Sequence, residues 1–400
     1  MINDERGRKT RIRAERVRAL LYLLLAALGC RAAGDATQRA APPDAALANR
    51  LQHLVDSTVA QTPSIPGLIV HVEAPKLRLA WSAAAGVFDR ATGEKLTADH
   101  MFRIASNTKT YVAAAVLRLA EEGKLRLTDP IARHLAPNTT ASLRAGGYDP
   151  HEITVHDLLQ HVSGLYDYAT DPTFAETEFG EPGHRWTRTE QLQFAVQHGK
   201  PYGRPGAVYH YSDTGYILLG EIIERLTGSP LGTGVRELLG FDRLGLAHTY
   251  FESLDSVPPG SGARAHQYAD STDIFGFDPS FDLYGGGGIV STIGELARFY
   301  RALLQGEVLR DRATLDTMLL VSRQSLVADS TRGYAMGIGR RHLGTLTCWG
   351  HGGYWGSVAV SCPTADITVA ITVNRSPDPA VDGAALVRRI IELVEAASRP

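Results

Sequence analysis

Cysteine is scarce in this chain of 400 residues, which has three: Cys30, Cys348 and Cys362. No two are spaced as C-x-x-C and none stands in a cluster with histidine, so no typical zinc or thiol-redox motif is present. Cys348 and Cys362 lie symmetrically about Tyr354-Trp355-Gly356, a run typical of a hairpin turn. Cross-strand neighbours there could form a disulfide in an oxidising compartment, and two free buried thiols are the alternative.

Lysine is also scarce, with six residues against 35 arginines. The first 29 residues carry a formal net charge of +4 and the remainder −6, so no basic stripe follows the N-terminus. This charge distribution argues against nucleic acid as a partner. A phosphate-binding G-x-x-x-x-G-K-[ST] loop is absent as well, although the chain has 40 glycines.

The N-terminus contains an apolar run of nine residues, Leu20 to Leu28, which is too short to span a bilayer as a mature helix. A basic segment, Arg6 to Arg18, precedes it. This order is typical of an export signal, and we assign residues 1–33 to it. An amphipathic N-terminal arm is the alternative.

The end of this signal has two interpretations. Ala27-Leu28-Gly29-Cys30 resembles a bacterial lipobox, which would make Cys30 a lipidated residue. Ordinary cleavage after Ala33 is the alternative. Residues 34–46 have no apolar periodicity and are predicted to form a tether. We therefore expect the protein in the bacterial periplasm or on a membrane as a lipoprotein.

The remaining chain, 47–400, has strand patterns near both ends and helical patterns between them. This order predicts an α+β fold with one antiparallel sheet built from both chain ends and flanked by helices. The sheet part covers about 47–103 and 281–400, and a helical part of about 104–280 packs beside it, leaving a cleft. The predicted segments are helices 47–60, 155–161, 191–197, 216–226, 289–304 and 384–397, and strands 68–72, 79–87, 336–339, 343–349, 357–362 and 367–373.

The most informative stretch is Ser106-Asn107-Thr108-Lys109, which we predict to be the first turn of a helix from Ser106 to Glu122. Positions i and i+3 share one helix face, so the Ser106 hydroxyl and the Lys109 amine can touch. An amine that sheds its proton can activate a serine nucleophile, whereas arginine cannot deprotonate. The use of lysine here, in an arginine-rich chain, favours a catalytic pair.

Two further segments gain meaning beside this pair: Tyr211-Ser212-Asp213 and His351-Gly352-Gly353. Taken in order, the three resemble the serine β-lactamase and penicillin-binding protein superfamily, which carries S-x-x-K, then Y-x-N, then K-T-G or H-x-G. Its members include class C-type β-lactamases, DD-carboxypeptidases, D-aminopeptidases and esterases. The resemblance covers about residues 66–374 and implies a β-lactamase/transpeptidase-like fold. Further matching phrases are Leu158-Leu159-Gln160-His161-Val162-Ser163-Gly164-Leu165, Arg204-Pro205-Gly206, Gly286-Gly287-Gly288-Ile289-Val290-Ser291-Thr292 and Tyr334-Ala335-Met336-Gly337.

The resemblance implies a covalent mechanism without metal or cofactor. Ser106 would attack a carbonyl and form an acyl-enzyme, with Lys109 helping to take the hydroxyl proton. Tyr211 would relay protons, provided that Lys109 and His351 lower the pKa of its phenol.

The remaining positions of the motifs would bind the substrate. The backbone N–H groups of Ser106 and Tyr354 would form an oxyanion hole. Gly352 and Gly353 would let the substrate approach the edge of the strand.

Two positions depart from the family pattern. Asp213 stands where many relatives have Asn, and a carboxylate cannot donate a hydrogen bond to a substrate carbonyl. It would also hold Lys109 protonated and shift the base role onto Tyr211. His351 replaces a lysine, which is more similar to DD-carboxypeptidases, aminopeptidases and esterases than to class C β-lactamases. Arg340-Arg341 is a candidate grip for a substrate carboxylate, or a solvated pair on a hairpin.

We therefore expect an exported serine hydrolase that acts through Ser106 on D-amino-acid peptides or β-lactams. The alternatives are a small-ester esterase and a penicillin-binding sensor or scaffold that acylates without turnover. We expect a small-molecule or peptide substrate, with peptidoglycan-derived peptides among the candidates. We also expect a monomer that contacts a membrane only if Cys30 is lipidated.

Overall fold

A computed structural model describes residues 45–376 and 380–398 of the chain. The predicted export signal 1–33, with Cys30, and all of the predicted tether except its last two residues lie outside this part. Among the described residues, no helix is both long and apolar enough to cross a bilayer.

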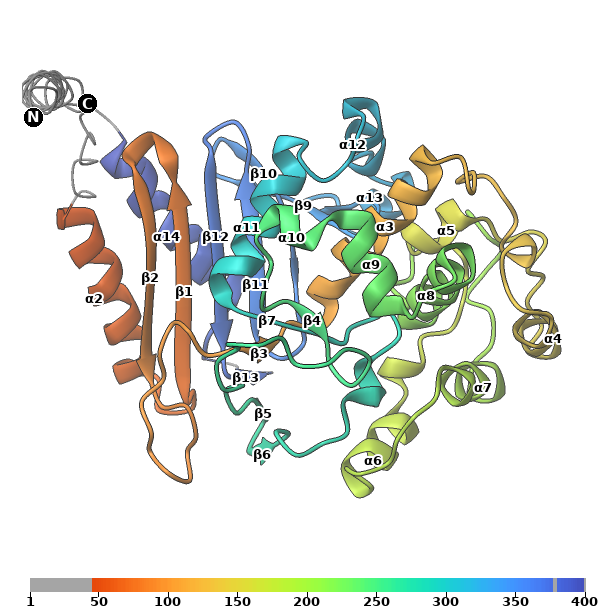
Figure 1. Ribbon diagram of the computed structural model, residues 1–400, viewed down its shortest axis with the longest axis horizontal. Coiled ribbons are helices and arrows are strands. Elements are labelled where there is room, and N and C mark those ends of the chain that lie inside the picture. Colours follow the sequence, from red (N-terminus) through yellow and green to blue (C-terminus); the bar gives the residue numbers. More distant parts are fainter. Residues whose placement is uncertain (1–44, 377–379, 399–400) are drawn as a thin grey trace, which may run out of the picture. The chain divides into compact units, whose positions relative to one another are not determined.

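A seven-stranded antiparallel sheet in the order β2-β1-β12-β11-β10-β9-β8 forms the centre of the described structure (Figure 1). Pairing of β1 with β12, which places Val70 opposite Ile371, joins the two ends of the chain as predicted. The strands are β1 Gly67–Ala74, β2 Leu79–Gly86, β8 Gly333–Tyr334, β9 Gly339–Leu343, β10 Leu346–Gly352, β11 Ser357–Cys362 and β12 Ile367–Val373.

Helices cover both faces of this sheet, and the side chains of β1 alternate between them. Leu68 and Val70 pack in one apolar cluster with helices α2 Ala45–Gln61 and α14 Gly383–Ala397. Ile69 points to the opposite face and packs in a second cluster with α11 Ile293–Gln305. This burial of both faces explains why β1 and β12 consist almost entirely of apolar residues.

The helical part packs beside the α11 face of the sheet (Figure 1). It also contains short strands that were not predicted, because two- or three-residue strands leave no periodic pattern. Its helices are α3 Thr108–Glu121, α4 Pro137–Ala145, α5 Val155–Leu159, α6 Pro172–Gly180, α7 Arg188–His198, α8 Asp213–Thr227, α9 Leu231–Leu239 and α10 Phe241–Leu244. Two short helices, α12 Arg312–Met318 and α13 Arg323–Ala328, follow α11 in the chain. The short strands form two small sheets that also use residues outside 104–280: one of β3 Phe102–Arg103, β7 Ile289–Ser291 and β4 Tyr250–Phe251, the other of β13 Arg375–Ser376, β5 Tyr268–Ala269 and β6 Thr272–Asp273.

Two strand predictions were wrong at glycines. The segment 343–349 is a hairpin turn and the start of β10, because Gly344 adopts a left-handed φ of 61°. The segment 336–339 is mostly a loop, in which Gly337 has a φ of 68° and Ala335 N–H donates to the carbonyl of Ile338. Glycine at positive φ ends a strand without steric cost, so the apolar residues around it were misleading.

A disulfide joins Cys348 of β10 to Cys362 of β11, with their Cα atoms 4.1 Å apart. Both side chains are fully buried. The bond ties two neighbouring strands together three residues before His351, and so it stiffens the strand that carries the histidine.

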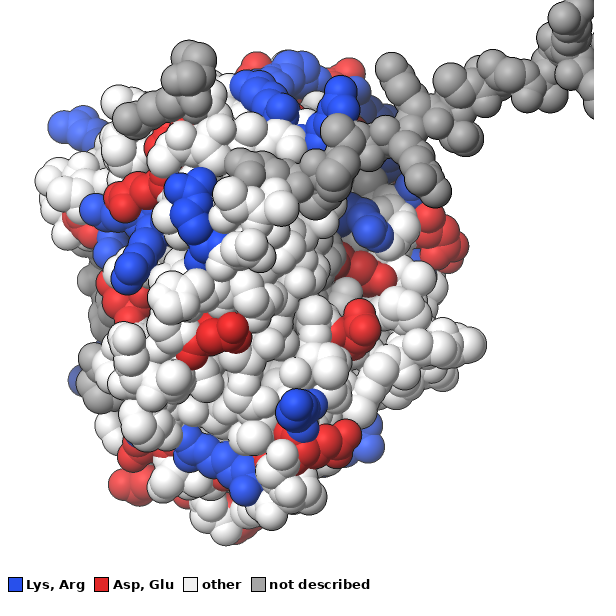
Figure 2. Space-filling model, turned by 90° about the vertical axis from the view of Figure 1, so that its left-hand side faces the viewer, with Lys and Arg blue, Asp and Glu red and all other residues white. Residues whose placement is uncertain are grey.

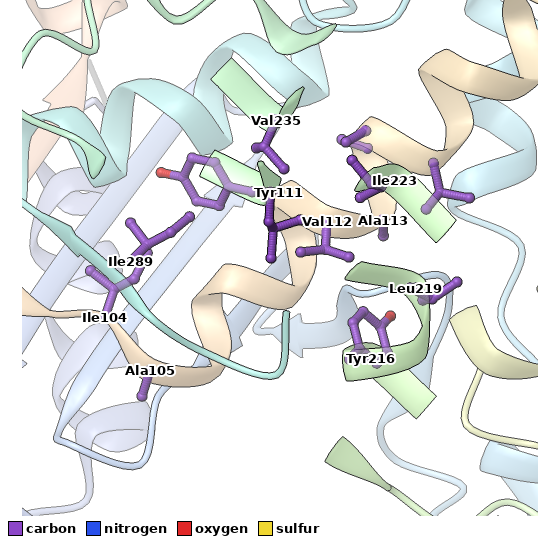
Figure 3. Packing of buried hydrophobic residues seen from close by; sticks show 14 of the residues in the cluster. Ile104, Ala105, Tyr111, Val112, Ala113, Tyr216, Leu219, Ile223, Val235 and Ile289 are labelled. Atoms are coloured by element: carbon purple, nitrogen blue, oxygen red, sulfur yellow. The ribbon is translucent and has the colours of Figure 1, made fainter. Parts of the chain in front are cut away.

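Helix α3 runs through the helical part and is buried along most of its length. Its Tyr111 ring stacks on Phe299 of α11 at 3.5 Å between centroids. Figure 3 shows Val112 and Ala113 of the same helix among apolar side chains that include Ile223 of α8 and Val235 of α9. This packing fixes the N-terminal end of α3, which carries Lys109 and directly follows Ser106.

The face on the side of α2 carries basic and acidic side chains interspersed with uncharged ones (Figure 2). Charges of one sign do not dominate the coloured residues of this view. The expectation that nucleic acid is not a partner stays a prediction.

Candidate active site

Ser106 lies in a 3₁₀ turn, Ala105–Asn107, that leads directly into α3. The prediction placed Ser106 in the α-helix itself, whereas the structure places it in the turn just before α3. The preceding Ala105 has a φ of 46°, a left-handed conformation that is unusual for a residue other than glycine. Strain of this kind is typical of functional sites. Ser106 itself is half-buried, and the residues on both sides of it are buried.

Lys109 is fully buried and places its amine beside the Ser106 hydroxyl, with Nζ 2.9 Å from Oγ. The same Nζ donates to the carbonyl of Gly286 at 2.7 Å and lies 2.6 Å from Asp213 Oδ1. A Cβ at Gly286 would come within 3.1 Å of the Asp213 carboxylate, so glycine lets the loop approach this ion pair. The Lys109 amine therefore contacts both Ser106 and Asp213, so these three predicted residues lie together.

Tyr211 lies just before α8, and its ring centroid is 4.9 Å from Lys109 Nζ. Burial raises the pKa of the Tyr211 phenol well above 10, and the Asp213 carboxylate adds to this rise. A hydrogen bond with Ser106 opposes the rise without cancelling it. The condition set for the relay role, that Lys109 and His351 lower this pKa, is therefore not met, because desolvation raises the pKa and keeps Tyr211 neutral.

His351, on β10, is buried and neutral. Burial and the nearby Lys109 lower its pKa to about 3. Its Nδ1 lies 2.6 Å from the carbonyl of Gly352, so Nδ1 carries the proton and Nε2 accepts from the Tyr334 hydroxyl at 3.0 Å. His351 therefore supplies no positive charge; it orients Tyr334, whose ring lies 6.0 Å from that of Tyr211.

The turn after β10 is held against the segment that precedes Ser106. A Cβ at Gly353 would lie 2.2 Å from the carbonyl oxygen of Ile104, and the hydroxyl of Ser357 donates to that oxygen at 2.8 Å. A Cβ at Gly352 would make only an ordinary van der Waals contact, 3.9 Å from the carbonyl oxygen of Ser357. Among the backbone hydrogen bonds of the described loops and turns, none uses the N–H of Tyr354. The oxyanion hole formed by the N–H groups of Ser106 and Tyr354 stays a prediction.

Two buried carboxyl groups near Lys109 were not predicted from the sequence. Asp167 accepts the backbone N–H of Asp213 at 2.9 Å. Burial and the Asp213 charge raise the pKa of Asp167 to about 7 and that of Asp282 also to about 7. No spacing in the sequence connects Asp167, Asp213 and Asp282, which come from three separate segments.

The raised pKa of Asp282 predicts a pH-dependent stability. Its ordinary pKa is 3.8, so between pH 4 and 7 the folded protein holds a proton that the unfolded chain releases. This group therefore makes the protein less stable as the pH rises through that range. The free energy of unfolding of Asp282→Asn, measured in urea, should therefore rise relative to that of the wild type as the pH increases from 5 to 8. The control is Asp242→Asn, because the side chain of Asp242 is 93% exposed. The prediction would be contradicted if the free energies of unfolding of Asp282→Asn and the wild type change in parallel with pH.

Comparison with known proteins places this geometry in a family. The family model described as Beta-lactamase matches residues 52–392. A protein of Escherichia coli (strain K12) named "Putative D-alanyl-D-alanine carboxypeptidase" is 25% identical over 91% of this chain and 92% of its own length. Esterase EstB of Burkholderia gladioli is 29% identical over 74% of this chain and 79% of its own.

Among solved structures, a D-stereospecific amidohydrolase from Streptomyces sp. is similar, with a TM-score of 0.73 and 29% identity. The match covers 86% of this chain and 98% of that one. It confirms the predicted fold class. With the family match across most of its length, the chain belongs to the beta-lactamase family and is a serine hydrolase.

Proposed function

We propose that this serine hydrolase cleaves peptides or amides of D-amino acids through an acyl-enzyme on Ser106. The observation that carries the proposal is the buried Lys109 amine, 2.9 Å from the half-buried Ser106 hydroxyl. The names of two relatives, a D-alanyl-D-alanine carboxypeptidase and a D-stereospecific amidohydrolase, support D-amino-acid substrates.

The neutral state of Tyr211 suggests how protons move in this reaction. As Ser106 Oγ attacks the substrate carbonyl, its proton passes to the Tyr211 oxygen while the Tyr211 proton passes to the leaving nitrogen. The tyrosine then remains neutral throughout, which suits a phenol whose pKa is raised by burial. Lys109 stays near the serine oxygen as a hydrogen-bond donor, and water later releases the acyl group by the reverse transfer.

A cavity of about 250 Å³ beside His351 supports a substrate with a carboxylate on the leaving-group side. Arg332, Arg340 and Arg341 line it together with Tyr209. The three guanidinium groups suit an anionic ligand, because arginine binds carboxylates through paired N–H donors. This position fits the earlier assignment of Arg340-Arg341 as a grip for a substrate carboxylate.

A peptide ending in D-Ala-D-Ala, its C-terminal amide and a p-nitrophenyl ester test the proposal. We expect kcat/KM to be highest for the free carboxylate, and Arg340→Gln to remove that preference while Arg312→Gln, an exposed control, keeps it. A preference for the amide would indicate an aminopeptidase or amidase, and turnover of the ester alone an esterase. A penicillin adduct without any turnover would indicate a sensor or scaffold.

We further propose that the protein is exported, as its N-terminal basic and apolar segments suggest. The disulfide between Cys348 and Cys362 supports an oxidising compartment.

A further inference from the structure

His161 lies directly behind Tyr211 but makes no contact with Ser106 or Lys109 in the hydrogen-bond network described above. It follows α5 with a left-handed φ of 56° and is only 1% exposed. Its ring centroid is 4.1 Å from that of Tyr211, at an angle of 33°. A buried polar ring in an unfavourable backbone conformation calls for a reason.

The contacts of His161 hold the chain on both sides of Tyr211. Its carbonyl oxygen accepts the backbone N–H of His210 at 2.9 Å, and its Nδ1 accepts the backbone N–H of Ser212 at 3.1 Å. One residue thus fixes the backbone before and after Tyr211 and supports the face of its ring. The left-handed φ allows the carbonyl and the ring to serve this one segment together.

The ring of His161 is neutral and a weak base, because adding a proton to it in this buried site is unfavourable. Burial and the charge of Lys109 lower its pKa well below 6.5. Because Nδ1 accepts from Ser212, the proton is on Nε2, which has no partner among the described residues. The rings of Tyr216 and Tyr334 surround it at 5.0 and 4.9 Å between centroids. The lowered pKa therefore keeps Nδ1 free of a proton, as an acceptor, at neutral pH.

We infer that His161 is a positioning residue for Tyr211, an inference that rests on the proposed acyl-enzyme function. Transfer of a proton between Ser106, Tyr211 and a leaving nitrogen requires hydrogen-bond distances at both steps. A displacement of about 1 Å can cost on the order of 100-fold in rate. Loss of the acceptor on Nδ1 would free Ser212 and allow Tyr211 to move away from Ser106.

The leaving group provides a readout that general structural damage would not move. A p-nitrophenolate leaves without protonation, whereas an amine must receive the Tyr211 proton. In His161→Leu we expect kcat for an amide to fall about 100-fold and kcat for a p-nitrophenyl ester to fall clearly less, with KM nearly unchanged. His161→Asn tolerates positive φ and offers an oxygen acceptor, so it should recover most of the amide rate.

A double-mutant cycle with Tyr211→Phe completes the test. If His161 acts through Tyr211, adding His161→Leu to Tyr211→Phe should reduce the rate no further. Should His161→Leu not fold, the cycle is run with His161→Asn, whose smaller loss must likewise vanish beside Tyr211→Phe.

The inference would be overturned if the rate losses of His161→Leu and Tyr211→Phe multiply in the double variant. It would also be overturned if His161→Leu lowers kcat equally for the amide and the ester. The proposed function fails separately, if Ser106→Ala keeps the wild-type rates. If Ser106→Ala is inactive and the rate losses of His161→Leu and Tyr211→Phe multiply, only the role of His161 is overturned.

Discussion

Ser106→Ala is expected to abolish acyl-enzyme formation and to lower kcat by about 10⁴- to 10⁶-fold, the range found when a catalytic serine is removed. The physical reason is that alanine leaves no oxygen beside Lys109 Nζ, which now lies 2.9 Å from Oγ. The backbone N–H groups of Ser106 and Tyr354 would remain, so some residual transition-state stabilisation should survive. Stability should change little, because Ser106 is half-buried and its side chain is small.

Intact-mass spectrometry with a fluorophosphonate and with a penicillin measures this directly. The wild type should gain the mass of each probe, and Ser106→Ala should gain neither. Ser57→Ala, on helix α2 at the far side of the sheet, is the matched control and should react as the wild type. Labelling that persists in Ser106→Ala would assign the nucleophile to another residue.

The lifetime of the penicillin adduct then separates the functions that the motifs leave open. An adduct that persists for hours indicates a carboxypeptidase or a binding module, and rapid loss indicates β-lactam hydrolysis. Asp213 favours persistence, because a carboxylate cannot donate to the acyl amide of a penicillin as an asparagine can.

Sequence patterns predicted the parts of the fold in which burial and periodicity agree. Strands β11 and β12 begin and end at the predicted residues, because most of their side chains are β-branched or apolar. The boundaries of β9 and β10 were not predicted, because the turn between them depends on the backbone freedom of Gly344. A pattern of side chains does not reveal where a glycine adopts a positive φ.

The active site, like the fold, was predicted only in part from the sequence. The pairing of Ser106 with Lys109 follows from helical spacing, and the structure brings them together across a 3₁₀ turn. The electrostatics do not follow from spacing. Burial and the nearby Asp213 raise the pKa values of Asp167 and Asp282, and the burial of Tyr211 itself raises the pKa of its phenol. Motifs identify the reacting atoms, whereas protonation states depend on neighbours from distant segments.

Lys109→Met should remove activity and also destabilise the fold. The Lys109 ammonium contacts Asp213 at 2.6 Å with no exposure to solvent, beside two further carboxyl groups, Asp167 and Asp282. Removing the cation leaves Asp213 buried without a counter-charge, a change that typically costs about 3–5 kcal/mol. Chemical denaturation should show this loss, and kcat should fall by at least about 100-fold, as expected when a positioned proton-transfer group is lost.

The double variant Lys109→Met/Asp213→Asn separates the two effects. Replacing the orphaned carboxylate by a neutral amide should return most of the lost stability, whereas activity should stay low because no amine faces Ser106. Lys124→Met is the control: its amine pairs with Glu122 at the surface at 3.0 Å, and its loss should cost at most about 1 kcal/mol and leave kcat unchanged.

A double variant as unstable as the single one would show that Asp213 is not the charge that Lys109 compensates. Recovery of stability without recovery of kcat would mean that the same amine does two separable things: it neutralises a buried carboxylate so that the site can fold, and it supports the Ser106 oxygen so that the site can react.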